Sequence, residues 1–465
     1  MLQLNLRTLA KPKFGALQSQ VTLNPDVYFY VNKDDIYAYY PNTNLAAKLS
    51  VEEYDFLRKH PYVQDPLLFE KYAGVINSFL YKRAAAPVQT ANTQQHFVNA
   101  SSIQHLSLII TTMCNLRCRY CYVYGGEPEL LFQEKGLKNV SATLDTKKAM
   151  AVIDMFKPKA LTISGWGEPF MAFDAMKEIL AHVDTTKIAV EVSTGGVLGV
   201  RRKEIISYLI EHKIKLHISF DGPDRFQDAN RPLPNGRSSV QEVLDTINEL
   251  KTHGPLASFA RARVTICGGM EDSIGEIASY LAGLGFKSIG FEPVELRGRA
   301  AEGIRLPDMN RFGANLANAI IEGKRQGFSI DSGLLPAASN SGLACFGCSL
   351  MAGEALTFAP DNSIYMCDDP LEVFKVGSVS AGPNGYGVQV DFDKISAISA
   401  KRHMFVLKEC TNCAVKCGGG CAKESLLTYG NMETGGESKE YCDARRSTLF
   451  EYIKAAFRQL PSDEA

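Results

Sequence analysis

The sequence has few of the features that mark membrane proteins or nucleic-acid-binding proteins. No apolar run approaches the ~20 residues that a helix needs to cross a bilayer, and the N-terminal stretch MLQLNLRTLAKPKFGALQ contains no signal-peptide core. The 50 basic and 51 acidic residues nearly cancel, so the composition does not favour nucleic acid or a membrane surface as a partner. We expect a globular, cytoplasmic protein of roughly two to four domains.

Cysteine, in contrast, is plentiful. The chain has 12 cysteines, and in a cytosolic protein such a number points to metal or redox chemistry rather than to disulfides. Three lie between positions 114 and 121, one is Cys267, and eight lie between positions 345 and 442. The two groups need separate explanations.

The first group lies in TTMCNLRCRYCY (111–122), called here the three-cysteine loop, which spaces Cys114, Cys118 and Cys121 as Cys-x3-Cys-x2-Cys. A structural zinc site needs a fourth ligand, and no histidine or further cysteine follows nearby. Three closely spaced cysteines also suit disulfides badly. Thiolates are the usual ligands of iron–sulfur clusters, and three of them on a four-iron cluster leave one iron open to a reactant. The stretch therefore suggests a catalytic cluster.

Residues 1–83 are expected to form a small separate α+β unit. Strands are predicted at 27–31 and 36–40, around an Asn-Lys-Asp-Asp turn. Ser50 and Glu53 have the spacing of a capping box, and PLLFEKYAGVINSFLYKR (66–83) has a helical pattern. Residues 84–102 are small and polar and predict a linker.

From residue 103 onward, strands and helices alternate. Strands are predicted at 105–111, 160–164, 187–193, 215–220, 261–266 and 288–292, with five helical segments between them. This alternation predicts an α/β fold with parallel strands and right-handed crossovers. Six units are too few for a closed eight-stranded barrel. For residues 103–300 we therefore favour a partial, open (β/α)6 barrel over a flat doubly wound sheet, followed by a bridging region at 301–340 and a cysteine-rich domain at 341–465.

The chemistry of such barrels lies on the loops that follow the strands. Here the first four strands lead into the three-cysteine loop, SGWGEPF, STGG and SFDGPDRF. A glycine-rich loop taken alone is as easily a tight turn. Because the four loops are expected to share one rim with three cysteines, the set favours a functional site.

These residues resemble those of the radical S-adenosylmethionine (SAM) enzymes. In that family three cysteines hold a [4Fe-4S] cluster whose open iron binds SAM, and cleavage of SAM gives a 5′-deoxyadenosyl radical that abstracts a substrate hydrogen. The resemblance implies that Tyr120 touches the adenine. It also implies that GWGEP (165–169) holds the methionine amino group through backbone carbonyls and Glu168, with Trp166 where a second glycine is common.

The same resemblance implies further SAM contacts. Gly165, Gly167 and Pro169 belong to the GWGEP motif, Ser193 and Thr194 fall at the ribose, Ser219 lies on the same rim, and Arg231 falls at the SAM carboxylate. For Arg231, an ordinary surface arginine is the alternative.

The eight late cysteines resemble the SPASM extension, which holds two auxiliary clusters in radical SAM enzymes that mature peptides. CGGGC (417–421) is a characteristic part of it, although the gap of three residues before Cys417 departs from the usual five. By position, the first auxiliary [4Fe-4S] cluster would be held by Cys345, Cys348, Cys367 and Cys421, and the second by Cys410, Cys413, Cys417 and Cys442. The number of cysteines alone is equally compatible with two zinc sites of four cysteine ligands each. Cys267 is expected to be a buried small side chain.

An aspartate that follows the cysteine at the place of Cys367 acts as a general base in sulfatase-maturing relatives. Asp368 holds that place in this sequence, and Asp369 competes with it. A simple turn is the alternative role.

The N-terminal strand pair resembles the peptide-recognition elements of ribosomal-peptide maturases, which add a leader peptide as an extra strand at a sheet edge. Together the resemblances imply three [4Fe-4S] clusters, SAM, a precursor-peptide substrate and a reductant such as flavodoxin or ferredoxin. We expect a carbon–carbon or thioether crosslink as the product. A formylglycine-type sulfatase maturase or another peptide modification is the first alternative, and a non-catalytic zinc-binding module is the second.

Overall fold

A computed structural model of the chain describes residues 5–7, 21–24, 26–32, 35–63, 68, 71–76, 78–83, 98–137, 140–335, 338–339, 342–343, 348–383, 385–404, 406–411, 413–436 and 438–458. Cys345 and residues 84–97 of the predicted linker lie outside this part of the chain. Val98, at the end of that linker, is buried, and its N–H donates to Ser396 Oγ at 3.0 Å.

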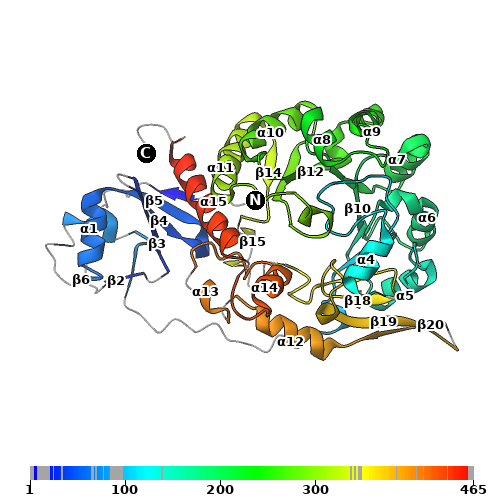
Figure 1. Cartoon of the computed structure of the whole chain (residues 1–465). Helices are drawn as coiled ribbons and strands as arrows, with labels where there is room; N and C mark the ends of the chain where they lie inside the picture. The colour runs from blue at the N-terminus through cyan, green and yellow to red at the C-terminus, as the bar shows by residue number, and fades with distance from the viewer. Residues whose placement is uncertain are drawn as a thin grey trace.

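The largest element is a sheet of eleven described strands in the order β14-β13-β12-β11-β10-β9-β8-β17-β18-β19-β20 (Figure 1). Its parallel strands are β8 (His105–Ile109), β9 (Ala160–Ser164), β10 (Ala189–Thr194), β11 (Lys215–Ser219), β12 (Ala260–Ile266), β13 (Ser288–Pro293), β14 (Ser329–Asp331) and β17 (Ala355–Phe358). From β8 to β14 the order never reverses, so right-handed crossovers place all helices on one face. The predicted partial barrel is confirmed, and the prediction missed β14 and β17.

Helices cover the outer face of this sheet. They are α5 (Thr146–Phe156), α6 (Phe173–Ala181), α7 (Arg202–Glu211), α8 (Asp224–Asn230), α9 (Val240–Thr252) and α10 (Ile274–Gly283). In α9, Val243, Ile247 and Leu250 recur every three or four positions and are buried. In β12, Val264 is buried toward the helices, while alternation places the half-buried Arg263 on the inner face. Among the described helices, none combines the length and the apolar character needed to cross a bilayer.

Strand β8 lies inside the sheet and is paired on both sides. Leu108 aligns with Ile163 of β9 and with Phe358 of β17, in parallel register in both cases. β18 (Ser363–Tyr365) returns antiparallel to β17 and leads directly into Cys367. The segment that carries Cys367 is therefore separated by β17 alone from the strand that delivers the three-cysteine loop.

The remainder of the C-terminal half packs on the barrel. Its other elements are α11 (Met309–Gln326), β15 (Ala338–Ser339), β16 (Gly342–Leu343), β19 (Lys375–Gly382), β20 (Gly385–Val390), α12 (Phe392–Arg402), α13 (Lys408–Thr411), α14 (Ala422–Tyr429) and α15 (Lys439–Arg458). A further helix, α4 (Pro128–Lys135), follows the three-cysteine loop. The β19–β20 hairpin projects from the body of the molecule (Figure 1). α15 lies against α11 at close range, since a Cβ on Gly313 would stand 2.5 Å from Thr448 Oγ1.

The N-terminal unit contains two small sheets. One has the order β1 (Asn5–Arg7), β5 (Leu45–Leu49), β4 (Asp35–Tyr40), β3 (Tyr28–Asn32), and the other β6 (Tyr62–Val63), β2 (Val21–Leu23), β7 (Tyr81–Arg83). Both predicted strands are present, and Ser50 and Glu53 form the predicted capping box at the start of α1 (Val51–Lys59). The helix predicted at 66–83 is wrong at its end, because residues 81–83 pair with β2; α3 (Ala73–Ile76) is a single turn.

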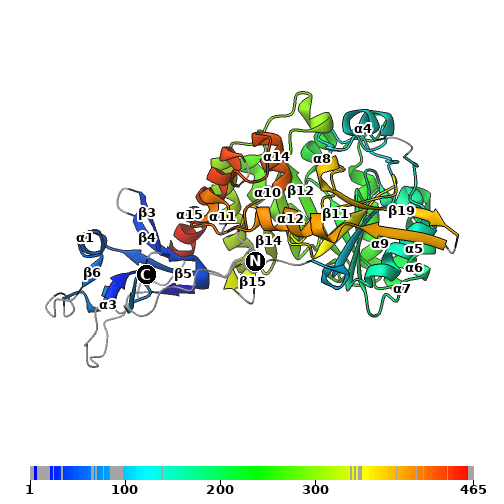
Figure 2. The same ribbon diagram turned by 90° about the horizontal axis from the view of Figure 1, so that it is seen from below.

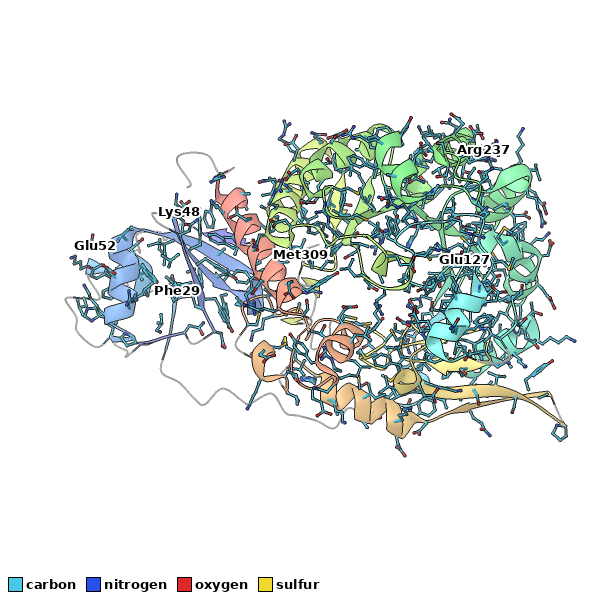
Figure 3. The ribbon with its side chains drawn as sticks, in the orientation of Figure 1. Phe29, Lys48, Glu52, Glu127, Arg237 and Met309 are labelled. Carbon is cyan, nitrogen blue, oxygen red and sulfur yellow. The ribbon has the colours of Figure 1, made fainter. Side chains whose placement is uncertain are left out.

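The larger N-terminal sheet lies between α1 and α15 (Figure 2). On the α15 side, Tyr30 stacks on Phe450 with ring centroids 5.2 Å apart. On the opposite side, Phe29 lies 5.5 Å from the ring of Tyr54 in α1 (Figure 3). Aromatic contacts with α15 therefore join this sheet to the rest of the protein, and β3 at its edge pairs only with β4 among the described strands.

Candidate active site

The loops that follow β8, β9, β10 and β11 meet at one rim of the barrel. The N–H of Glu168, after β9, donates to the Met113 carbonyl in the three-cysteine loop at 2.7 Å. The N–H of Gly195, after β10, donates to Glu168 Oε2 at 2.7 Å. The Tyr120 hydroxyl donates to Oδ2 of Asp221, after β11, at 2.5 Å. The four loops form one connected network.

Two arginines hold the backbone of the three-cysteine loop. Arg299, from the loop after β13, donates to the carbonyls of Cys118 at 2.8 Å and Gly125 at 2.5 Å. Arg117 donates to the Cys114 carbonyl at 3.1 Å. Because both guanidinium groups bind carbonyl oxygens, the loop conformation does not depend on a bound group alone.

The cysteine side chains of this loop share one cradle. A Cβ on Gly125 would lie 3.4 Å from Cβ of Cys114 and 3.5 Å from Sγ of Cys121. Burial, with a smaller effect of the neighbouring charges, raises the pKa of Cys114 to about 12 and that of Cys118 to about 11. Without a bound cation these thiols keep their protons, and a metal centre displaces them. The cradle and its donor set fit a thiolate-bound cluster.

Glu168 is buried and accepts three hydrogen bonds. Its donors are the Thr194 hydroxyl at 2.7 Å, the Gly195 N–H at 2.7 Å and the Phe170 N–H at 3.3 Å. These bonds favour the charged carboxylate. Burial outweighs them, and the pKa of Glu168 rises to about 7. This carboxyl group therefore titrates near neutral pH.

The other residues of the GWGEP motif are closely packed. A Cβ on Gly167 would overlap the Met113 carbonyl, and one on Gly165 would lie 2.6 Å from the Gly167 carbonyl oxygen, so both positions require glycine. Pro169 begins a short 3-10 helix that Glu168 caps. Trp166 is buried with 1% of its surface exposed.

Tyr120, Asp221 and Arg231 form a buried group beside Cys118. Arg231 Nε lies 3.2 Å from Asp221 Oδ2 as an ion pair without hydrogen-bond geometry, and its guanidinium lies 5.0 Å from the Tyr120 ring centroid. Another of its nitrogens lies 3.9 Å from Cys118 Sγ. Arg231 is only 8% exposed, so the alternative of a surface arginine is wrong. Burial raises the pKa of Tyr120 well above its usual value.

The residues expected at the ribose fall on two faces. Ser193 and Ser219 are half-buried at the ends of β10 and β11, on the inner face by strand alternation. Thr194 lies on the opposite face, where its hydroxyl donates to Glu168 and accepts from the Gly196 N–H at 2.9 Å. The hydroxyl of Thr194 is therefore committed to holding Glu168.

Three late cysteines lie around Lys423. Burial raises the pKa values of Cys348 and Cys367, the ammonium of Lys423 lowers both, and Cys421 adds to the rise at Cys367. Lys423 also lies 5.5 Å from the ring centroid of Tyr122, which follows Cys121. This group comprises the described cysteines of the predicted first auxiliary site, and Lys423 places it next to the three-cysteine loop.

The remaining late cysteines line one cavity of about 410 Å³. They are Cys410, Cys413, Cys417 and Cys442. The same cavity is lined by four basic residues: Lys416, Lys439, Arg445 and Arg446. Since one water molecule takes up about 30 Å³, the space is large enough for a multi-atom group. Among the described residues, no three His, Cys, Asp or Glu side chains are close enough to hold a single metal ion.

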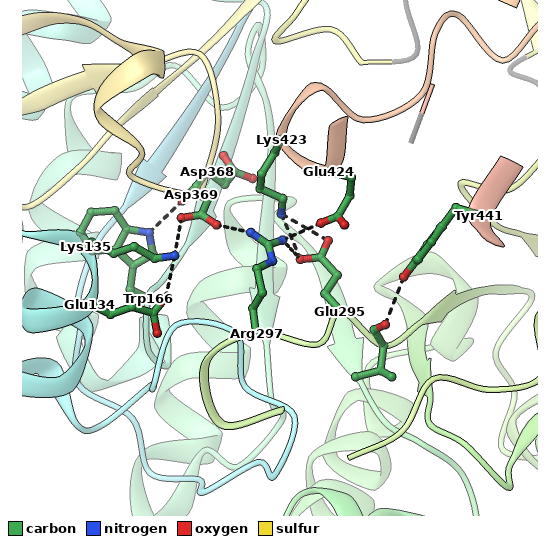
Figure 4. A network of polar contacts seen from close by, with 11 residues as sticks. Glu134, Lys135, Trp166, Glu295, Arg297, Asp368, Asp369, Lys423, Glu424 and Tyr441 are labelled. Carbon is green, nitrogen blue, oxygen red and sulfur yellow. Dashed lines mark hydrogen bonds and ion pairs between the residues drawn. The ribbon is translucent and has the colours of Figure 1, made fainter. Parts of the chain in front are cut away.

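The two aspartates after Cys367 have different surroundings (Figure 4). Asp369 is 1% exposed and pairs with Lys135 at 3.2 Å and with Arg297 at 2.6 Å. Asp368 is half-buried, and its Oδ1 accepts from the Thr357 hydroxyl at 2.6 Å. Asp369 is therefore fixed in an ionic network, whereas Asp368 is the one available to a reactant.

Sequence reasoning missed several residues of this site. Asp221, Arg299 and Lys423 are brought to it by loops distant in sequence, and only Asp221 lay in a stretch, SFDGPDRF, that the pattern of strand ends singles out. Cys267 is buried as expected, and burial raises its pKa to about 12.

The comparison with protein families agrees with this geometry. Residues 108–280 match the model of the radical SAM superfamily. The chain contains a radical SAM domain. It is an enzyme, and its three-cysteine loop fits the SAM-binding [4Fe-4S] cluster of that superfamily, so the alternative of a non-catalytic zinc-binding module is wrong.

Relatives of the radical SAM domain include characterised and uncharacterised proteins. A serine-type anaerobic sulfatase-maturating enzyme of Klebsiella aerogenes is 23% identical over 350 residues, which are 71% of this chain and 82% of that protein. An uncharacterised protein of Methanocaldococcus jannaschii is 27% identical over 198 residues, which are 41% of this chain and 62% of that protein. The chain thus spans less than two thirds of the length of this second relative.

Solved structures share the fold. A structure of anSMEcpe with bound AdoMet has a TM-score of 0.57 and 18% identity, and the match covers 77% of this chain and 100% of that one. Streptococcus suis SuiB bound to S-adenosylmethionine has a TM-score of 0.51 and 14% identity, and the match covers 90% of this chain and 99% of that one. At these identities the likeness concerns the fold alone.

Glu168 is predicted to make the stability of the cluster-free protein pH dependent. Its pKa is raised from 4.5 to about 7 in the folded state. The folded protein keeps a proton that the unfolded chain releases above pH 4.5, so this contribution is full below pH 4.5 and is lost as the pH rises to 7. It amounts to at most about 3 kcal/mol, since one pKa unit corresponds to about 1.4 kcal/mol. Urea unfolding of wild type and E168Q between pH 5 and 8 measures it.

In that comparison, the stability of wild type relative to E168Q should fall from pH 5 through pH 7 and level off near pH 8. A difference that is constant over the whole range would show that Glu168 is ionised throughout.

Proposed function

We propose that this radical SAM enzyme is a maturase that abstracts a hydrogen atom from a ribosomally made peptide and installs a crosslink. The observation that carries the proposal is the burial of a second cysteine group against the SAM site. Trp166, after β9, contacts Asp368, and Lys135, in α4, contacts Asp369, the two residues directly after Cys367. A crosslink removes two hydrogens from the peptide, and the second electron needs an acceptor close to the SAM site.

The relatives support a peptide substrate. A sulfatase-maturating enzyme matches 71% of this chain, and anSMEcpe was also solved with AdoMet and the Cp18Cys peptide, with a TM-score of 0.56 to this chain. The match to SuiB covers more of this chain than the match to anSMEcpe, 90% against 77%. The wider match favours a maturase that carries an N-terminal unit.

We assign the SAM-site residues as follows. Cys114, Cys118 and Cys121 hold the cluster, which with SAM supplies the electron and the carbon radical that takes the hydrogen. Tyr120 lies along the adenine, and Ser193 and Ser219 face the ribose from the inner side. Arg231, next to Cys118, faces the SAM carboxylate and is held by Asp221.

Glu168 and the backbone of residues 165–169 receive the SAM amino group. Thr194 supports this role indirectly, because its hydroxyl fixes the Glu168 carboxylate at 2.7 Å. The network keeps Glu168 in place in the absence of SAM, so little ordering is needed when SAM binds.

The late cysteines hold two auxiliary clusters in our proposal. Cys345, Cys348, Cys367 and Cys421 form the first auxiliary site. Cys410, Cys413, Cys417 and Cys442 form the second auxiliary site, where a common cavity and four basic neighbours suit four thiolates. The first auxiliary site is the electron acceptor, since Lys423 and Tyr122 connect it to the three-cysteine loop.

The edge strand β3 is the docking place for a leader peptide. It pairs only with β4 among the described strands, and Val31 on it is 50% exposed. Backbone groups at such an edge can pair with an added strand. Lys416, in the wall of the second auxiliary site, lies 5.8 Å from the Tyr28 ring centroid, so a docked peptide would lie beside the cysteine-rich part of the chain.

Formylglycine formation in a sulfatase is the second candidate, favoured by the Klebsiella relative. It requires a base for the second proton, and Asp368 is suited to this because it lies after Cys367 and is half-buried. The two candidates differ in substrate: one is a short precursor peptide, and the other is a cysteine- or serine-bearing sulfatase motif.

Anaerobic turnover tests the proposed function. With dithionite and SAM, the wild type is expected to form 5′-deoxyadenosine, and the triple variant C114A/C118A/C121A is expected to form none, because the cluster ligands are lost. Peptides encoded beside the gene and sulfatase-motif peptides are then compared by mass spectrometry. A crosslinked precursor peptide, lighter by two hydrogen atoms, would support the proposal. SAM cleavage with neither peptide class modified would contradict a maturase.

Asp368 and Asp369 are predicted to respond differently to substitution. D368N should keep the fold and SAM cleavage but lose product, since it removes a proton acceptor. D369N removes the negative charge that pairs with the buried side chains of Lys135 and Arg297. It should lower the free energy of unfolding by about 3 kcal/mol. Thermal unfolding, iron content and the ratio of product to 5′-deoxyadenosine measure the two effects. Equal behaviour of the two variants would contradict these separate roles.

A further inference from the structure

The only tryptophan of the chain lies in the GWGEP motif, at the position where the family commonly has glycine. Trp166 is 1% exposed. It packs in a small apolar cluster with Ile109, Val123, Leu131, Ala359 and Tyr365. These residues come from β8, the three-cysteine loop, α4 and the β17–β18 hairpin, so the indole lies where the barrel meets the segment that carries Cys367.

The indole has one polar contact, and it reaches the residue after Cys367. Trp166 Nε1–H donates to the main-chain carbonyl of Asp368 at 2.9 Å (Figure 4). A buried indole N–H needs such a partner. The bond therefore ties the 165–169 loop, which receives SAM in the proposed function, to the 367–369 turn.

The main chain of Trp166 is fixed on the other side by the three-cysteine loop. Its carbonyl oxygen would lie 3.3 Å from a Cβ on Gly125, which also packs against Cys114 and Cys121. Its neighbour Gly167 packs against the Met113 carbonyl, to which the Glu168 N–H also donates. The backbone at Trp166 cannot shift without moving the cysteine loop.

The 367–369 turn has few other attachments to the barrel loops. Asp369 is held by Lys135 and Arg297, and the Asp368 carboxylate is held by Thr357. The peptide group between Asp368 and Asp369, next to the Asp368 side chain and one residue beyond Cys367, is held by Trp166 through its carbonyl oxygen.

We propose that Trp166 is a positioning residue, which through its indole N–H fixes Asp368 and Cys367 in relation to the bound SAM. This inference rests on the proposed function, in which Cys367 is a ligand of the first auxiliary site, and on the predicted role of Asp368 as a proton acceptor. The proposal concerns the indole side chain, which acts through Asp368, and not the backbone of Trp166, which belongs to the 165–169 segment. Its effect is on the second half of the reaction, after SAM has been cleaved.

The test uses W166F, which keeps an aromatic ring and removes the N–H donor. SAM cleavage should fall less than product formation, because the substitution keeps the main chain of residues 165–169. Product per 5′-deoxyadenosine should fall about tenfold or more, because misplacing a reactive group by ~1 Å can cost up to about a hundredfold. Hydrogen exchange of residues 366–371, measured on the full chain by mass spectrometry, should become faster.

Y365F is the matched control. Tyr365 belongs to the same apolar cluster, and its hydroxyl donates to Asp361 Oδ2 at 2.6 Å, away from the 367–369 turn. Y365F therefore loses one hydrogen bond of a similar kind and should leave the exchange of residues 366–371 and the product ratio unchanged.

A shape-preserving replacement covers the case in which W166F does not fold. Because the chain has one tryptophan, global incorporation of benzothienylalanine replaces Nε1–H by sulfur at this position only. The expected results are those given for W166F.

Unchanged exchange and product ratio would overturn the inference, as would a fall in SAM cleavage that equals the fall in product. If the wild type modifies no peptide, the proposed function fails. The exchange measurement then still decides whether Trp166 holds the turn.

Discussion

The parallel pairing of β17 with β8 is the constraint on which the rest of the site depends. Without it, β8 would be the edge of the seven parallel strands β8 to β14. The chain after the barrel would then have no fixed position relative to β8. With it, the register of Leu108 and Phe358 lays the β17–β18 hairpin along the strand that delivers the three-cysteine loop. Cys367 and its aspartates then follow at a fixed place beside Trp166.

Close backbone approach and buried charge secure this arrangement. Gly167 lets the Met113 carbonyl approach where any side chain would collide, and a Cβ on Gly125 would be in tight contact with the Trp166 carbonyl. Asp369, Lys135, Arg297, Glu424 and Glu295 make a network of ion pairs that joins α4, the loop after β13, the 367–369 turn and the start of α14 (Figure 4). Because such buried charges are costly when unpaired, the network favours one relative placement of these four segments.

The sequence alone predicted the elements and motifs that depend on residues close together in the chain. The six barrel strands are apolar and separated by amphipathic helices, and the three-cysteine loop and GWGEP are contiguous motifs. β14 and β17 were not predicted because they are only three and four residues long. They form strands because they pair with strands distant in sequence. For the same reason 81–83 was mistaken for helix, since pairing with β2 overrides the local pattern.

The supporting residues of the site could not be predicted from the sequence either. Nothing near Arg299 or Lys423 in sequence indicates that one would bind the Cys118 carbonyl and the other would lie beside Tyr122. Asp221 could be singled out only as part of a loop after a strand. Contacts across more than a hundred residues are a property of the fold, and they decide which of two adjacent aspartates is buried in ion pairs and which is exposed to a reactant.

The central claim is that a second thiolate site lies next to the SAM site. Iron, sulfide and zinc analysis of the anaerobically reconstituted chain, alongside the variant C348A/C367A/C421A, tests it most directly. The account predicts about twelve irons per wild-type chain, as three four-iron clusters, and a loss of about four irons in the variant with SAM cleavage retained. Two zinc ions and no more than about four irons in the wild type would contradict it.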